Sequence, residues 1–169
     1  MRVKSRSMPV VTEILRLDGY LDGLTLEATS SGLCGVRFDA RPQPDKPGPL
    51  VLEAARQLRE YFSGERAVFD LPLAPEGTPF QLEVWRALTK IPYAETASYR
   101  DIAIAVNRPK GFQAIGQANT RNPLPIVVPC HRVINADGSM GGYGGGVDRK
   151  RILLELEQRH AHRFRQTAA

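Results

Sequence analysis

The sequence contains very little cysteine and histidine. Only two of its 169 residues are cysteine, Cys34 and Cys130, so a disulfide framework is excluded. The three histidines and two cysteines form no closely spaced cluster of the kind that holds a metal ion. We therefore expect a protein that needs no metal and no cofactor.

Long apolar runs are also missing. No stretch approaches the roughly 20 apolar residues of a membrane-spanning helix. Residues 1–6 are basic, but no long apolar segment follows them, as one would in an export signal. We expect a cytoplasmic protein that makes no contact with a membrane.

Acidic residues are outnumbered by basic ones. The chain has 23 lysines and arginines against 18 aspartates and glutamates, which gives a formal net charge of +5 at pH 7. An excess of positive charge favours an acidic partner such as nucleic acid. The length of 169 residues, 42% of them hydrophobic, is enough for one large domain or two small ones.

Residues 10–39 have the pattern of β structure. Every second side chain in the middle of this stretch is apolar, which is the period of a half-buried strand. The alternating apolar residues are Leu24, Leu26 and Ala28. A turn is predicted at Ser31 and Gly32, after which Cys34 shares a face with Val36. We interpret Cys34 as a core residue, because free cysteines are often buried.

Prolines cluster in residues 40–49 and predict a loop. A helix follows, with an apolar stripe on one side and Gln57 on the opposite, polar side. The stripe consists of Val51, Ala55, Leu58 and Phe62. Gly64 is placed to end this helix, and the two prolines within residues 71–77 indicate a linker.

The linker divides the sequence into an N-terminal domain, residues 1–76, and a C-terminal domain, residues 77–169. The second domain opens with a capping box, in which Thr78 and Gln81 stand three residues apart and a proline occupies the first helical position. Strands followed by helices predict an α/β (α+β) fold. We expect a small β-rich N-terminal domain with a flanking helix, and a mainly helical C-terminal domain.

Two short helices are predicted next. Ser98 caps the first, the second covers roughly residues 111–119, and Asn107, Arg108 and Pro109 break the chain between them. Such a pair is typical of a helix-turn-helix that binds DNA. Two ordinary packing helices give the same pattern, so both interpretations stay open here.

The second of these helices has a low surface profile. Gly116 lies inside it, where glycine costs about 1 kcal/mol relative to alanine, which indicates that something approaches the backbone closely. Ala114 and Ala118 keep that surface small, as a narrow groove requires. Basic residues near the helix pair are either phosphate ligands or ordinary surface charges. They are Arg100, Arg108, Lys110 and Arg121.

A cysteine and a histidine stand side by side in the apolar run of residues 126–133. Only the thiolate form of cysteine is a good nucleophile, and free cysteine has a pKa of about 8.5. A neighbouring imidazole commonly removes the proton. Cys130 and His131 are therefore predicted to be a nucleophile and its base.

Two further features point to the same site. Residues 141–146 contain five glycines around Tyr143, which indicates either a flexible loop or a pocket wall against a flat ligand. In the closing helix, Glu157 falls within the apolar arc and Glu155 falls outside it. Glu157 either flanks the core and meets water, or bonds to His131 and fixes the tautomer of its imidazole.

In their order and spacing, these motifs resemble the O6-alkylguanine-DNA alkyltransferases. The match is close over about residues 78–158, and the N-terminal domain fits more loosely as the family's β-rich domain. The most specific motif runs from Pro129 to Val133. The others are Phe80-Gln81, Val84-Trp85, Ile91-Pro92-Tyr93, Ser98-Tyr99, Ile102-Ala103, Asn122-Pro123, Gly142-Tyr143-Gly144-Gly145 and the stretch from Leu153 to Glu157.

The resemblance implies the reaction. Members of this family move an alkyl group from O6 of guanine in DNA, and also from O4 of thymine, onto a cysteine that keeps it, so each molecule acts once. Carried onto this sequence, Cys130 is the acceptor, His131 removes its proton and Glu157 orients His131. Neighbours in an extended segment point apart, so a water relays the proton. Tyr99 helps to rotate the nucleotide and protonates the leaving guanine, and Asn122 supports the turn near the cysteine.

The resemblance also implies the partner, double-stranded DNA that carries O6-alkylguanine. The damaged base must leave the stack to reach the cysteine. The pocket for this base is expected from Pro125, Val133, Tyr143 and Gly144. DNA contacts are expected from Arg100, Lys110, Gln113, Ala114, Gly116, Ala118, Thr120 and Arg121. The free protein is expected to be a monomer, and cooperative assembly on DNA is left open.

Two positions depart from the family's pattern. Gln113 stands where the family usually has an arginine that fills the gap left by the flipped base. We expect this change to lower DNA affinity without removing the chemistry. Ala94 stands where glycine is common after the Ile-Pro-Tyr motif, and we expect little effect from it.

Two other functions fit parts of the pattern. A non-catalytic lesion sensor would bind alkylated DNA without transferring the group, but relatives of that kind replace the cysteine that is present here as Cys130. A Cys-His-Glu hydrolase would need donors that stabilise an oxyanion, and the sequence gives no independent sign of them.

Overall fold

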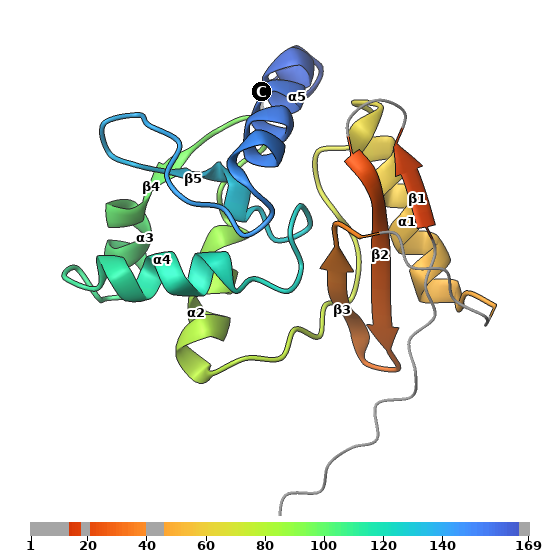
Figure 1. Ribbon diagram of the computed structural model, residues 1–169, viewed down its shortest axis with the longest axis horizontal. Coiled ribbons are helices and arrows are strands. Elements are labelled where there is room, and N and C mark those ends of the chain that lie inside the picture. Colours follow the sequence, from red (N-terminus) through yellow and green to blue (C-terminus); the bar gives the residue numbers. More distant parts are fainter. Residues whose placement is uncertain (1–13, 18–20, 40–45, 166–169) are drawn as a thin grey trace, which may run out of the picture.

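A computed structural model describes residues 14–17, 21–39 and 46–165 of the chain (Figure 1). Its first part consists of β1 (Ile14–Leu17), β2 (Leu21–Thr29), β3 (Gly32–Arg37) and α1 (Pro49–Phe62). Its second part consists of α2 (Pro79–Leu88), β4 (Ala97–Ser98), α3 (Tyr99–Ala105), α4 (Phe112–Thr120), the 3-10 helix η1 (Cys130–Arg132), β5 (Val133–Ile134) and α5 (Val147–Arg165). Residues 10–13 and 18–20 of the predicted β structure and residues 40–45 of the predicted loop lie outside the described residues.

The three strands form one antiparallel sheet in the order β1-β2-β3, and α1 packs across all three of them. Helices α2, α3 and α4 gather on the other side of the molecule (Figure 1). The predicted fold, with a small β-rich part, a flanking helix and a mainly helical part, is confirmed. The domain boundary between residues 76 and 77 stays a prediction. No helix among the described residues is long and apolar enough to cross a membrane.

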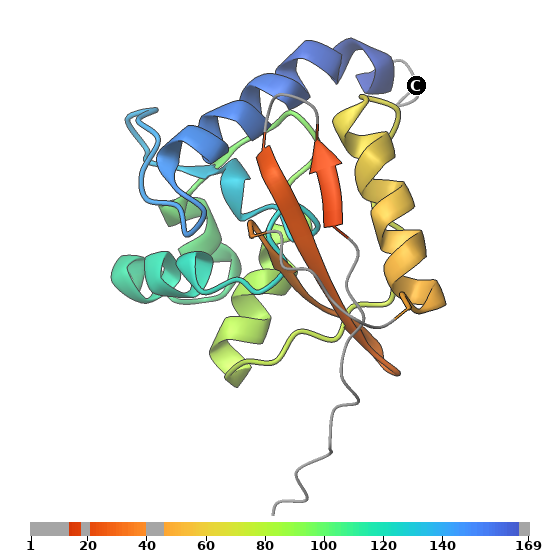
Figure 2. The same cartoon turned by 45° about the vertical axis from the view of Figure 1, so that its right-hand side comes forward.

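Helix α5 spans both parts of the molecule (Figure 2). Near its end, the Nη1 atom of Arg163 donates to the carbonyl oxygen of Gly64, just beyond α1, at 3.1 Å. Gly64 has a φ of 74°, and a Cβ there would lie 2.3 Å from the imidazole of His160. The predicted helix stop at Gly64 is therefore confirmed, and it is also the point where α5 docks.

The position of Cys34 differs from the prediction because β3 contains a bulge. Leu26 pairs with Val36, but Ala28 pairs with Leu33, so one residue of β3 is left over. Since Leu26 and Ala28 share a face of β2, Leu33 and Val36 both point into the core, where they are 0% and 2% exposed. Cys34 is the extra residue and is only half-buried. Its interpretation as a core residue on the face of Val36 was wrong.

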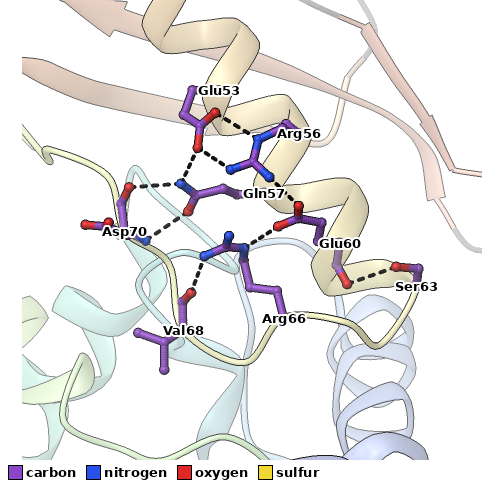
Figure 3. A network of polar contacts seen from close by, with 8 residues as sticks. All are labelled: Glu53, Arg56, Gln57, Glu60, Ser63, Arg66, Val68 and Asp70. Carbon is purple, nitrogen blue, oxygen red and sulfur yellow. Dashed lines mark hydrogen bonds and ion pairs between the residues drawn. The ribbon is translucent and has the colours of Figure 1, made fainter.

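The segment that follows α1 is tied to that helix by a polar network (Figure 3). Gln57, predicted to face water, is buried and exchanges two hydrogen bonds of 2.9 Å with the backbone N–H and carbonyl of Asp70. Arg66 contacts the carboxylate of Glu60 at 2.6 Å and donates to the carbonyl of Val68 at 2.9 Å. A buried amide paired in this way fixes the chain on its way to the second part.

The predicted linker follows the edge of the sheet. The N–H of Leu33 donates to the carbonyl of Pro72, and the N–H of Ala74 donates to the carbonyl of Leu33, both at 2.8 Å. A Cβ at Gly32 would lie 2.7 Å from the Pro72 oxygen, so glycine permits this close approach. The segment thus adds backbone hydrogen bonds to β3.

The helices of the second part begin where the sequence predicts. Thr78 and Gln81 form the capping box of α2, and Ser98 forms a second one at α3. Asn107 turns the chain between α3 and α4 with a φ of 56°, a conformation that asparagine tolerates well. The indole of Trp85 donates to the carbonyl of Ala118 at 2.9 Å, which fastens α4 to α2.

Candidate active site

Cys130 begins η1 and lies within a continuous buried stretch that runs from Leu124 to Val133. Asn122 holds this stretch, because its Nδ2 donates to the carbonyl of Val128 at 2.8 Å and its Oδ1 accepts from the N–H of Leu124 at 2.9 Å. Ile126 has a φ of 76°, which is strained for a β-branched residue. Asn122 therefore stabilises a strained turn directly before the cysteine.

The thiol of Cys130 lines a pocket of about 320 Å³. Burial raises the pKa of this thiol to about 11, although contacts with Asn122 and the positive charge of Lys150 oppose the increase. At neutral pH the sulfur therefore carries its proton, and a base is needed to form the thiolate.

His131 is fully buried beside Cys130. Its Nε2 lies 2.7 Å from Oε1 of Glu157, whereas its Nδ1 has no hydrogen-bond partner among the described protein atoms. Burial lowers the pKa of the imidazole, although Glu157 acts to raise it. The segment is a 3-10 helix rather than the extended chain that we predicted. The two side chains therefore do not point apart for the reason we gave, which was that neighbouring side chains alternate along an extended strand.

Glu157 projects from α5 into the interior and is 0% exposed, while Glu155 faces water. Besides His131, its carboxylate accepts hydrogen bonds from the hydroxyl of Tyr61 at 2.6 Å, the N–H of Ala94 at 3.0 Å and the guanidinium of Arg132 at 2.9 Å. Burial acts to raise the pKa of Glu157, but the hydrogen bonds and charges of His131 and Arg132 outweigh it and bring the pKa to about 2. The predicted contact with His131 is present.

Arg132 was missed by the sequence analysis. It is 6% exposed, contacts Glu157 with two nitrogen atoms, and donates from Nη1 to the carbonyl of Ile91 at 2.7 Å. Its positive charge neutralises that of Glu157, so the imidazole of His131 lies beside an ion pair rather than beside a lone carboxylate. The sequence did contain a signal for this role: Arg132 stands inside an apolar run, and a buried cation needs a partner of opposite charge.

Lys150 was also missed. It is fully buried near the start of α5 and donates to the carbonyls of Val133 at 2.5 Å, Gly142 at 3.3 Å and Met140. Burial lowers its pKa to about 8. Lys150 lies three and seven residues before Leu153 and Glu157, so the helical periodicity that placed Glu157 inside applies to it as well.

The glycine-rich segment forms one wall of the pocket. A Cβ at Gly144 would lie 2.7 Å from the carbonyl of Thr120, so glycine lets this wall close against α4. Tyr143 stacks edge to face on Phe38 with centroids 6.3 Å apart, and Arg149 lies 4.9 Å above the Phe38 ring. The sequence analysis did not anticipate Phe38, because nothing in the local pattern places the end of β3 beside residues 143–149.

Three of the four predicted pocket residues line this pocket. They are Pro125, Tyr143 and Gly144. Val133 is fully buried in β5, where it pairs with Ala97, and does not line it. The end of β3 supplies lining residues that we did not predict, Arg37, Phe38 and Asp39.

A larger groove, of about 830 Å³, runs over the outer face of α4. Five of the predicted DNA contacts line it, Arg100, Gln113, Gly116, Thr120 and Arg121. Ala114 and Lys110 border a smaller hollow at the end of the same helix. Ala118 does not belong to this surface, because it is 2% exposed and packs inward against Trp85. Thr120 lines both the groove and the Cys130 pocket, so the two are adjacent.

Tyr99 stands where the groove meets the glycine-rich segment. Its hydroxyl donates to the carbonyl of Gly142 at 3.3 Å, and a Cβ at Gly141 would lie 3.0 Å from the hydroxyl oxygen. Burial and the nearby Cys130 raise the pKa of the phenol, so it keeps its proton at neutral pH.

Among the described residues, no group of three or more histidine, cysteine or acidic side chains is arranged to hold a metal ion.

The sequence analysis did not anticipate the backbone conformation of Ala94. This residue adopts a φ of 61°, in the left-handed region, while its N–H donates to Glu157. We predict that Ala94→Gly raises the free energy of unfolding by about 0.5–1 kcal/mol, because glycine removes the steric strain. Chemical denaturation measures this change. Ala114→Gly, in the exposed interior of α4, is the control and should lower stability by about 1 kcal/mol. A loss of stability in Ala94→Gly would contradict the prediction.

The chain is similar to known proteins over most of its length. The family model for the DNA-binding domain of 6-O-methylguanine DNA methyltransferases matches residues 79–159. A methylated-DNA–protein-cysteine methyltransferase of Methanosarcina barkeri is 56% identical over 106 residues, 63% of this chain and 67% of that protein. One from Mycolicibacterium paratuberculosis is 45% identical over 155 residues, 88% of this chain and 94% of that protein. The crystal structure of Mycobacterium tuberculosis OGT in complex with DNA matches with a TM-score of 0.77 at 45% identity, covering 85% of this chain and 91% of that one.

Proposed function

The chain belongs to the 6-O-methylguanine DNA methyltransferase family, and we propose that Cys130 is the residue on which it accepts the alkyl group. The protein repairs DNA by transferring the alkyl group of O6-alkylguanine to itself. The observation that carries the assignment of Cys130 is that its thiol lines a pocket that shares Thr120 with the groove over α4. A base rotated out of DNA in that groove has only a short path to the sulfur.

The transfer is a displacement at the alkyl carbon. The sulfur of Cys130 attacks this carbon, an S–C bond forms, and the bond from the carbon to O6 breaks. The thiol gives up its proton to His131, and the leaving guanine gains one, for which the hydroxyl of Tyr99 is placed at the edge of the groove. The thioether is not hydrolysed, so each molecule acts once.

His131 acts as the base. With Nε2–H donated to Glu157, Nδ1 keeps a lone pair and receives the thiol proton through a water. The ion pair of Glu157 with Arg132 holds the imidazole in this tautomer while leaving it neutral. Asn122 keeps the strained turn, and with it the sulfur, in place.

The protein is a monomer, and it binds double-stranded DNA with the surface over α4. Arg100, Arg121 and Lys110 are exposed and hold phosphates, and Gly116 gives the backbone of α4 close access to a groove of the duplex. The pocket also takes O4-alkylthymine, which presents the same alkyl–oxygen bond. The protein acts in the cytoplasm, because its substrate, the DNA of the cell, lies in that compartment.

Incubation with an oligonucleotide carrying O6-methylguanine, followed by mass spectrometry of peptides, tests the assignment. We expect one methyl group on Cys130 and no turnover beyond one equivalent. Tight binding without a mass change would identify a lesion sensor. Turnover beyond one equivalent would identify a hydrolase. A methyl group on Cys34 would overturn the assignment of the site.

The transfer rate should stay constant through neutral pH and fall only in acid. Because burial lowers the pKa of His131 from an ordinary value of 6.5, protonation of this base begins below that pH. Single-turnover rates between about pH 5 and pH 8 measure the profile. His131→Gln should be slow and should lack the acidic decrease. A midpoint at or above the ordinary histidine pKa would contradict the prediction.

A further inference from the structure

Phe112 presents a large apolar side chain on the surface that faces DNA. It is the first residue of α4, is 47% exposed, and lines the groove together with Tyr99 and Gln113. Phe112 borders the buried face of α4, which consists of Ile115, Ala118 and Asn119, but it lies in the first turn of the helix and nearly half of it stays exposed. Its ring is therefore available to a partner in the groove.

The neighbours of Phe112 on the helix are small. Phe112, Gly116 and Thr120 are spaced by four residues and form one stripe along α4. A Cβ added at Gly116 would meet no atom within 4 Å, so the middle of the stripe is low and open. One aromatic ring thus stands at the end of an otherwise shallow surface, which is the shape of a wedge.

The charge of the groove fits a nucleic acid. Arg100 and Arg121 line it, and none of the described residues that line it carries a carboxylate. Lys110 adds a third exposed cation beside the N-terminus of α4. Phe112 and Gln113 line the same groove as Arg100 and Arg121, so a duplex held by these cations lies against both side chains.

We propose that Phe112 enters the duplex beside the lesion and stacks on the base that borders the gap left by the rotated nucleotide. This inference rests on the proposed function and names the residue that keeps the duplex open. Unstacking a base costs free energy, and an apolar wedge recovers part of it by stacking. Gln113, next to it, fills space and forms hydrogen bonds but has no ring. The aromatic side chain therefore carries the stacking.

Single-turnover transfer from two substrates tests the wedge. One is a duplex with O6-methylguanine, in which the base must be unpaired and unstacked, and the other is the short single strand with the same lesion. Phe112→Ala should slow transfer from the duplex by about 10- to 100-fold, the loss expected for one base–aromatic stack. Transfer from the single strand should change by less than about threefold. Phe112→Tyr, which keeps the ring, should restore the duplex rate.

Leu52→Ala is the matched control, because Leu52 is exposed to the same degree, 46%, but lies on α1. It should leave both rates unchanged. An unchanged duplex rate in Phe112→Ala, or equal losses on both substrates, would overturn the wedge alone. If the unchanged protein takes no methyl group from either substrate, the proposed function fails, and this inference fails with it.

Discussion

Replacement of Cys130 by alanine is expected to abolish alkyl transfer and to leave binding to alkylated DNA intact. The variant removes only the sulfur, which is the atom that forms the new bond. Cys130 does not line the groove over α4, so the DNA surface keeps its shape in the variant. Mass spectrometry measures the transfer, and a mobility shift with the methylated duplex measures the binding. We expect no detectable methylated protein under conditions in which the unchanged protein is fully methylated.

Cys34→Ala provides the matched control for this experiment. Cys34 is the only other cysteine in the sequence, and burial and nearby carboxylates raise the pKa of its thiol. It lies on the bulge of β3 without a neighbouring imidazole among its described interactions. Transfer by Cys34→Ala should equal that of the unchanged protein. Methylation of Cys130→Ala, or loss of its DNA binding, would refute the prediction.

Replacement of Glu157 by alanine should destabilise the fold by about 3–5 kcal/mol. The carboxylate is the shared acceptor for the side chains of Tyr61, His131 and Arg132. Without it, the Arg132 guanidinium is left in the interior without its counter-ion, and this uncompensated charge accounts for most of the cost. Denaturant titration measures the change. Glu155→Ala, two residues away on the exposed face, is the control and should change stability by less than about 0.5 kcal/mol.

The same carboxylate makes stability depend on pH. The pKa of Glu157 is about 2 in the folded protein against an ordinary value of 4.5. As the pH falls below the ordinary value, the unfolded chain takes up a proton before the folded one does. The contribution of Glu157 is therefore fully present above about pH 4.5 and is lost progressively as the pH falls toward about 2. Glu157→Gln should flatten this part of the stability profile, and an unchanged slope would contradict the assignment.

The N-terminal part of the protein takes part in the site through two contacts. Tyr61 of α1 donates to Glu157, and Phe38, directly after β3, packs against Tyr143. The first contact supports the base, and the second supports the pocket wall. The sheet and α1 therefore contribute directly to the environment of Cys130.

The fold was predicted from the sequence where the signals are local. The capping boxes at Thr78 and Ser98 fixed the starts of two helices, since they are satisfied within three residues of the chain. Predictions failed where a contact with a distant segment decides the result. Gln57 is buried because the backbone of Asp70 pairs with it, and Cys34 is displaced because β3 bulges against β2.

The same distinction between local signals and distant contacts applies to the candidate site. The sequence by itself determined the reactive groups, because an adjacent cysteine and histidine have a defined chemistry and helical periodicity turns Glu157 inward. Only the tertiary structure decided which partners these groups have. The ion pair with Arg132, the buried cation of Lys150 and the pocket wall at Phe38 come from segments far apart in the chain. The physical reason is that burial and hydrogen-bond partners, which set the pKa values, exist only after these segments have packed together.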